Sequence, residues 1–182
     1  MLRAYTTLSA IRDRAQTALR VRQGDARFAG FPAMTSHLIQ RAQRAEQELA
    51  RRLRQSNVAR QFGFELEAVE PGRAVLRMRV ASRHKQVHGV VHGGILAALA
   101  DTAGGLATYM VVPRGTRLAT VEMKINYLEP VHQGTIKAEA RVLRRGRNFA
   151  VIDCDVLEAT GRLVAKALMT FSIGSAEKHR RR

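Results

Sequence analysis

The sequence predicts an α+β fold in which an antiparallel sheet of about five to six strands wraps one long helix. Three observations predict this fold. The stretch from Ile95 to Val112 is apolar on nearly every side, and a helix of that kind must be buried. Several other segments alternate apolar and polar residues, which is the period of a β-strand. The turns between neighbouring segments are short, so successive strands are expected to be antiparallel.

Two kinds of element precede the apolar helix. Residues 36–56 have helical periodicity with charges of both signs, and Ser36 is a candidate N-cap. Residues 62–70 and 73–81 read as two strands joined by a hairpin at Pro71-Gly72. The helix at 36–56 and the hairpin are therefore expected to precede the wrapped helix in the chain.

Four alternating segments follow the apolar helix, and the sequence predicts that they form a meander. They are residues 116–128, 135–143, 148–158 and 163–173. One apolar helix enclosed by such a sheet is the hotdog arrangement, with the helix as the sausage and the sheet as the bun.

The chain divides into four parts. The predicted hotdog domain covers residues 58–174 and a leading helix covers 34–57. A basic N-terminal extension, disordered or helical, covers 1–33, and a basic tail covers 175–182.

The net charge of +16 would attract polyanions such as nucleic acid, an anionic membrane or phosphate-bearing small molecules. A solvated basic surface explains the same charge. Aromatic residues make up 5% of the chain, Trp is absent and no nucleic-acid motif is seen, so no specific nucleic-acid partner is expected. Asp101 and the many Gly, Ala and Thr residues around it argue against a membrane span at 95–112.

A single cysteine, Cys154, rules out an intrachain disulfide and favours a reducing, cytoplasmic location. Its acidic neighbours Asp153 and Asp155 disfavour the thiolate, so a packed structural thiol is expected. Residues 1–33 are rich in arginine and poor in acids, which leaves a mitochondrial transit peptide as the alternative. A start upstream of the true one, before Met34, would explain the same stretch.

Asp101 lies in the middle of the apolar helix, where an unpaired carboxylate is costly. Gly93 and Gly94 lie where that helix starts, and its unpaired backbone N–H groups could polarise a carbonyl in acyl transfer. A catalytic acid and a hydrogen-bonded structural Asp both fit these residues.

Distance along the helix limits how the two features could cooperate. From Gly93 to Asp101 the helix rises by about 12 Å, at about 1.5 Å per residue. One chain therefore cannot place both groups on one carbonyl. Two antiparallel helices related by a two-fold axis can, which predicts an isologous dimer with two shared sites.

Three segments then point to a family. The stretches "VHGGILAALADTAGGLA", "TVEMKINYLEPV" and "AKALMTFSI" resemble the PaaI-type (phenylacetyl-CoA thioesterase-like) branch of the hotdog acyl-CoA thioesterases. The resemblance covers about residues 58–174. It implies hydrolysis of an acyl-CoA thioester in a site shared across a homodimer, itself expected to pair into a tetramer. It implies no cofactor, since coenzyme A is part of the substrate.

The resemblance also assigns roles to residues. It makes Asp101 the nucleophile or the general base, and the backbone N–H of Gly93 the group that polarises the carbonyl. Gln86 stands where the family often has Asn, and related thioesterases use Gln there to orient the carbonyl or the water. Thr120 is expected to position the water, and His92 to hold the loop more than to exchange protons.

Further residues are expected to contact the substrate. Gly94 and Tyr127 are expected to bind the substrate. A compact basic cluster around the Gly146 turn could bind the coenzyme A phosphates, although a solvated hairpin tip explains it as well; it consists of Arg144, Arg145 and Arg147. Candidates for the lining of the acyl pocket are Tyr109, Met110 and Met123.

Three other readings compete. His84, His88 and His92 have the spacing of a metal site on a helix, but Gly89 and Val90-Val91 favour an extended chain, so no metal is expected. A non-catalytic acyl-CoA-binding protein of the same fold is the main alternative function. An acyl-CoA hydratase is a further one.

Overall fold

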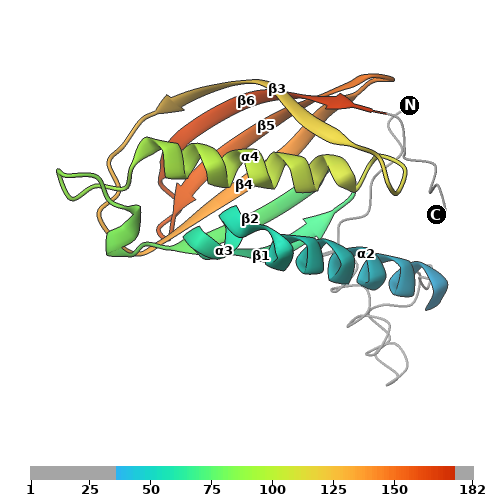
Figure 1. The fold of residues 1–182 in the computed structure, drawn as a ribbon, viewed down its shortest axis with the longest axis horizontal. Helices are drawn as coiled ribbons and strands as arrows, with labels where there is room; N and C mark the ends of the chain where they lie inside the picture. The colour runs from blue at the N-terminus through green and yellow to red at the C-terminus, as the bar shows by residue number, and fades with distance from the viewer. Residues whose placement is uncertain (1–35, 175–182) are drawn as a thin grey trace, which may run out of the picture.

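The computed structural model describes residues 36–174, and for residues 36–43 and 45 it describes the backbone alone (Figure 1). The predicted extension at 1–33, the tail at 175–182 and the predicted Ser36 side-chain cap therefore lie outside what is described. The elements are α2 (Ser36–Gln55), α3 (Asn57–Phe62), β1 (Phe64–Glu70), β2 (Arg73–Arg79), the 3-10 helix η2 (Ser82–His84), α4 (Gly93–Tyr109), β3 (Leu118–Tyr127), β4 (Thr135–Arg145), β5 (Phe149–Glu158) and β6 (Leu163–Ile173). All six predicted strands are present, and their ends differ from the predicted ends by two residues at most.

The six strands form one antiparallel sheet in the order β1-β2-β4-β5-β6-β3. The predicted meander is therefore wrong at its first step: β3 pairs with β6, and β4 pairs with β2. Residues 128–134 are too long a connection for a tight hairpin, and Val131 ties them to the loop before α4 by accepting a 2.8 Å hydrogen bond from Val91 N–H. The rest of the meander, β4-β5-β6, is confirmed. As a result β3 lies at an edge of the sheet.

The sheet curves around α4, which packs on β2, β4 and β5 (Figure 1). Leu99 and Ala103 of α4 are fully buried, as are Leu76, Ile136 and Ile152 of the sheet. Truncating a buried Leu such as Leu99 to Ala would cost about 2–5 kcal/mol. Gly104 allows the close approach, because a Cβ there would overlap Met169 Sδ. The predicted hotdog fold is confirmed.

The leading helix differs from the prediction at its end, because a short second helix, α3, follows it. Ser56 caps α3 by accepting from Ala59 N–H at 3.3 Å, and Gly63 ends it with φ of 69°, in the left-handed region that favours glycine. Leu49 and Leu53 of α2 are buried. Within residues 36–174, no helix combines the length and the hydropathy that crossing a bilayer requires.

Candidate active site

The N-terminal end of α4 offers one unpaired donor. His92 caps the helix, and its Nδ1 accepts from Gly94 N–H at 2.9 Å. The His92 carbonyl accepts from Ile95 N–H at 2.9 Å. Gly93 N–H has no hydrogen-bond partner within residues 36–174. The cap thus occupies the Gly94 donor and leaves the Gly93 N–H, at the positive end of the helix dipole, for a ligand. This contact supports the expectation that His92 holds the loop.

The aromatic ring of Tyr127 lies over Gly93. A Cβ at Gly93 would stand 2.9 Å from Tyr127 Cζ, closer than carbon atoms pack. The ring can occupy this place only because residue 93 has no side chain. Tyr127 is 51% exposed, so it forms a wall beside the helix start and is still open to solvent.

Asp101 and Thr120 are brought together by α4 and β3. Thr120 Oγ1 donates to Asp101 Oδ1 at 2.7 Å. A β-bulge in β3 between Thr120 and Glu122 makes this contact possible. Thr120 lies opposite the buried Phe171 and Met123 lies opposite the buried Met169. Without the extra residue the two side chains, three positions apart, would point to opposite faces of the sheet.

A cavity of about 490 Å³ opens at this pair. Its apolar wall comes from α2, α4, β3 and β6, and includes Leu53, Leu106, Leu118 and Phe171. The carboxylate of Asp101 therefore stands at the edge of a space that can take an apolar group.

The structure separates the predicted site residues into two groups. Gln86 lies in the turn before α4, where its N–H donates to Val90 O and its carbonyl accepts from Gly89 N–H, each at 2.9 Å. Its side chain is exposed.

The same end of α4 holds His92, Gly93, Gly94 and Tyr127, whereas Asp101 and Thr120 lie about two helical turns away. Within one protomer these two groups do not meet.

The predicted acyl-pocket residues divide similarly. Tyr109 lines the cavity of Asp101, and Met110 lines a neighbouring cavity. Met123 is partly buried and lines neither. Sequence reasoning missed Arg52 of α2, which lines both cavities. The sequence does place Arg52 between Leu49 and Leu53 on the apolar face of α2. It does not show that this face packs against α4.

The three histidines have different surroundings. His84 is fully buried and its Nδ1 accepts from Ala81 N–H at 3.0 Å, whereas His88 is exposed and His92 caps α4. In the part of the chain that the structure describes, no three His, Cys, Asp or Glu side chains are grouped as metal ligands.

The single thiol has the setting that its neighbours predicted. Cys154 is fully buried. Burial, together with the charges of Asp155 and Asp153, raises its pKa to about 12. The thiol is therefore protonated at neutral pH and packs as an apolar side chain.

The basic cluster lies at the tip of the β4–β5 hairpin, and Arg144, Arg145 and Arg147 are all exposed. This tip is at the end of the sheet where β3 begins, because Ile173 N–H donates to Asn148 O at 2.7 Å and Gly174 N–H to Arg117 O at 2.8 Å. None of the three arginines lines the cavity of Asp101.

Comparison with known proteins agrees with this fold. The thioesterase superfamily pattern matches residues 88–165. A putative esterase of Saccharolobus solfataricus is 37% identical over 105 residues, which are 58% of this chain and 74% of the relative. Human acyl-coenzyme A thioesterase 13 is 32% identical over 112 residues, or 60% of this chain and 79% of the relative.

Solved structures of other proteins have the same fold. A thioesterase of Haemophilus influenzae superposes with a TM-score of 0.68 at 29% identity and covers 74% of this chain and 94% of its own. The Escherichia coli PaaI protein, at 23% identity, shares the fold with a TM-score of 0.67 over 74% of this chain and 97% of its own. The chain belongs to the thioesterase superfamily and is a thioester hydrolase with the hotdog fold.

Proposed function

We propose that the protein hydrolyses acyl-CoA thioesters in a site that two protomers share. Asp101 and Thr120 come from one protomer, and the Gly93 N–H and Gln86 come from its partner. The observation that carries the proposal is the separation of these groups along α4, with an unpaired donor at Gly93 and a hydrogen-bonded carboxylate at Asp101. The likeness to acyl-coenzyme A thioesterase 13 supports coenzyme A as the thiol of the substrate.

The edge strand β3 supports the dimer. Its edge carries unpaired backbone groups, and Val121 is 55% exposed. Thr120 lies near one end of β3, and Tyr127, which covers Gly93, forms the other end. Antiparallel pairing of two β3 strands about a two-fold axis between these residues brings Thr120 next to the partner's Tyr127, and Asp101 next to the partner's Gly93.

A second interface on the outer face of the sheet would pair two dimers into a tetramer. Phe149 and Leu168 belong to this face, because their chain neighbours Ala150 and Ala167 are buried on the face toward α4 and side chains alternate along a strand. They are 52% and 46% exposed and four residues apart in register along β5, so they offer two separate apolar side chains for a further contact.

The chemistry follows from the residue types. The partner's Gly93 N–H and Gln86 amide polarise the thioester carbonyl without placing a cation next to Asp101. Thr120 occupies Oδ1 of Asp101 and leaves the other oxygen free to act. As a general base, Asp101 takes a proton from water, the water oxygen bonds to the carbonyl carbon, and the C–S bond breaks to release the thiolate of coenzyme A. As a nucleophile, Asp101 bonds to that carbon itself, the thiolate leaves, and water then cleaves the anhydride.

Arg144, Arg145 and Arg147 are proposed to bind the phosphates of coenzyme A. They are exposed, clustered on one hairpin and in no ion pair with another described residue. Arginine suits phosphate because its planar fork makes paired hydrogen bonds. The enzyme is proposed to work in the cytoplasm, where coenzyme A esters and the reduced thiol of Cys154 are compatible.

Subunit mixing tests the shared site. Asp101→Asn and Gln86→Ala variants are each assayed for thiol release from an acyl-CoA panel, and the Asp101→Asn variant is expected to lose about 10²–10⁴-fold in kcat. Mixing the two under conditions that exchange subunits gives hybrids with one intact site and one doubly defective site. For equal amounts of the two variants, about a quarter of wild-type activity should return.

Native mass spectrometry of differently tagged chains verifies that hybrids have formed. Hybrid dimers with no recovered activity would overturn the shared site. Absence of thiol release from every acyl-CoA in the wild type would instead overturn the coenzyme A assignment and favour a different thioester.

A further inference from the structure

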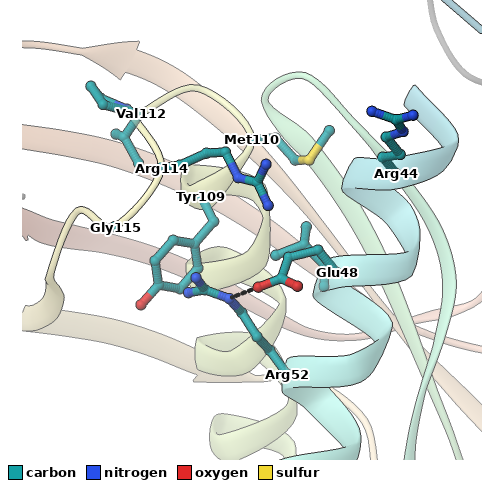
Figure 2. A pocket seen from close by; sticks show the side chains of 10 residues that line it. Arg44, Glu48, Arg52, Tyr109, Met110, Val112, Arg114 and Gly115 are labelled. Carbon is teal, nitrogen blue, oxygen red and sulfur yellow. Dashed lines mark hydrogen bonds and ion pairs between the residues drawn. The ribbon is translucent and has the colours of Figure 1, made fainter. Parts of the chain in front are cut away.

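The cavity of Asp101 is closed at its far end by two side chains. Arg52 of α2 and Tyr109 of α4 line both this cavity and a second one of about 350 Å³, which lies between α2 and the end of α4. Because the two side chains belong to both linings, they form the wall between the cavities. Figure 2 shows Arg52 next to the ring of Tyr109, with Glu48 on its other side.

Contacts on both sides hold this wall in place. The guanidinium carbon of Arg52 is 5.1 Å from the centre of the Tyr109 ring, a cation–π distance. Arg52 Nε donates to Glu48 Oε1 at 3.0 Å (Figure 2). Hydrogen bonds from Arg51 and then Arg52 lower the pKa of Glu48 to about 2, so Glu48 keeps its charge at any pH at which the enzyme would work. Arg52 is thereby fixed between an aromatic ring and a carboxylate.

The path from the reacting end to the wall is open. Asp101, Gly105 and Tyr109 are spaced by four residues on α4 and line the same cavity. Gly105 has no side chain to block the path between the other two. Asp101 and Tyr109 are separated by about 12 Å along the helix. That distance matches roughly eight to ten methylene groups in an extended chain with C–C bonds of about 1.5 Å.

We propose that Arg52 and Tyr109 limit the length of the acyl group that the enzyme accepts. This inference rests on the proposed acyl-CoA hydrolysis. The acyl chain lies along α4 from Asp101 over Gly105 and ends at Tyr109, so the preferred substrates are short and medium acyl groups of about ten carbons or fewer. Longer chains require Arg52 to leave both Tyr109 and Glu48 before they enter the second cavity.

The second cavity is suited to take a longer chain once the wall is removed. Leu49, Met110 and Val112 give it an apolar lining. Arg44 and Arg114 are exposed and line it as well. Opening the wall therefore joins the two cavities and gives the distal methylenes an apolar surface.

The test compares acyl-CoA chains of increasing length with wild-type enzyme and Arg52→Ala. Wild-type kcat/KM should fall once the chain exceeds about ten carbons, and Arg52→Ala should raise the ratio of long-chain to short-chain kcat/KM at least tenfold. Each newly buried methylene is worth about fourfold in affinity, so two or three suffice. Arg51→Ala is the matched control, because Arg51 also binds Glu48 but lines neither cavity, and its length profile should match wild type.

Gly105→Ala provides a second variant with the opposite expectation. An added Cβ would be 3.6 Å from Phe171, an ordinary contact, so the fold should accept it. The methyl group narrows the path and should shift the preference to shorter chains. Unchanged length profiles in both variants, with short acyl-CoA still hydrolysed, would overturn the proposed limit on acyl length and leave the proposed hydrolysis standing. If the wild-type enzyme hydrolysed no acyl-CoA, both the proposed function and the proposed limit on acyl length would be overturned.

Discussion

Thr120 and Asp101 are joined by a 2.7 Å hydrogen bond in which the Thr120 hydroxyl donates to Oδ1. The bond connects the central helix to an edge strand, and a β-bulge aims the hydroxyl at the helix. It fixes the orientation of a carboxylate that would otherwise rotate freely. Asp101 is the proposed general base or nucleophile, so this orientation should affect the rate.

Thr120→Val should lower kcat/KM for acyl-CoA by about 10–100-fold, because a hydrogen bond to a charged group is worth about 1.5–3 kcal/mol. Thr120→Ser keeps the donor and should retain most of the activity. Both are measured by thiol release, with circular dichroism as the check on folding. Equal activity of the Val and Ser variants would show that the hydroxyl does not contribute.

Gly93→Ala tests the start of α4. The new Cβ would be 2.9 Å from Tyr127 Cζ, at the far end of a half-exposed side chain that can move. The fold should therefore survive, with the ring pushed away and a methyl group beside the N–H donor. We expect kcat/KM to fall at least tenfold, since the loss of one oxyanion donor typically costs about 10²–10³.

Tyr127→Phe is the companion variant for Gly93→Ala. It keeps the ring over Gly93 and removes only the hydroxyl, so activity near that of wild type is expected. A larger loss in Tyr127→Phe than in Gly93→Ala would mean that the phenol, rather than the helix start, contacts the substrate.

The limits of sequence reasoning are physical. Alternation predicted each strand because the sheet has one face on α4, and the apolar stretch after Gly93 predicted the buried helix. The place of β3 was missed, because strand order depends on where residues 128–134 lead the chain and not on the pattern within β3. The short helix α3 was also missed, although Ser56 and Gly63 are its N-cap and C-terminal signals.

The candidate site shows the same division. The position of Asp101 in an apolar helix marked it as a candidate, the resemblance added Thr120, and the structure brings these two together. The wall of Arg52 and Tyr109 was not predicted, because it depends on how α2 is rotated about its own axis. That rotation is set by the burial of Leu49 and Leu53, a property of packing rather than of spacing.

The arginine cluster gives a prediction about binding rather than turnover. Reversing Arg144, Arg145 and Arg147 to Glu should raise KM for an acyl-CoA by about tenfold or more, because exposed ion pairs are each worth up to about 1 kcal/mol. An acyl-pantetheine has no nucleotide phosphates, so its KM should change far less. Equal changes for the two substrates would remove the cluster from the coenzyme A site.

His84 gives a prediction about stability and pH. It is fully buried, its Nδ1 accepts from Ala81 N–H, and its carbonyl accepts from His92 N–H at 2.8 Å, next to the helix cap. Burial, followed by the charge of Arg83, lowers the pKa of His84, while the nearby Phe62 carbonyl opposes the shift. Because Nδ1 accepts from Ala81 N–H, the neutral ring carries its proton on Nε2, and a second proton would have to enter at Nδ1 and break this hydrogen bond.

The sign of the pH effect follows from the lowered pKa. The unfolded chain takes up the His84 proton near pH 6.5 and the folded protein only at lower pH, so acid favours unfolding. The free energy of unfolding should fall by up to about 1.4 kcal/mol per pH unit below pH 6.5, until the folded-state pKa is reached. Urea unfolding at pH 7.5, 6.0 and 5.0 measures this fall. His84→Gln keeps an acceptor for Ala81 but does not titrate, so its unfolding free energy should fall less over that range; identical pH dependence in the two proteins would assign the acid sensitivity to other groups.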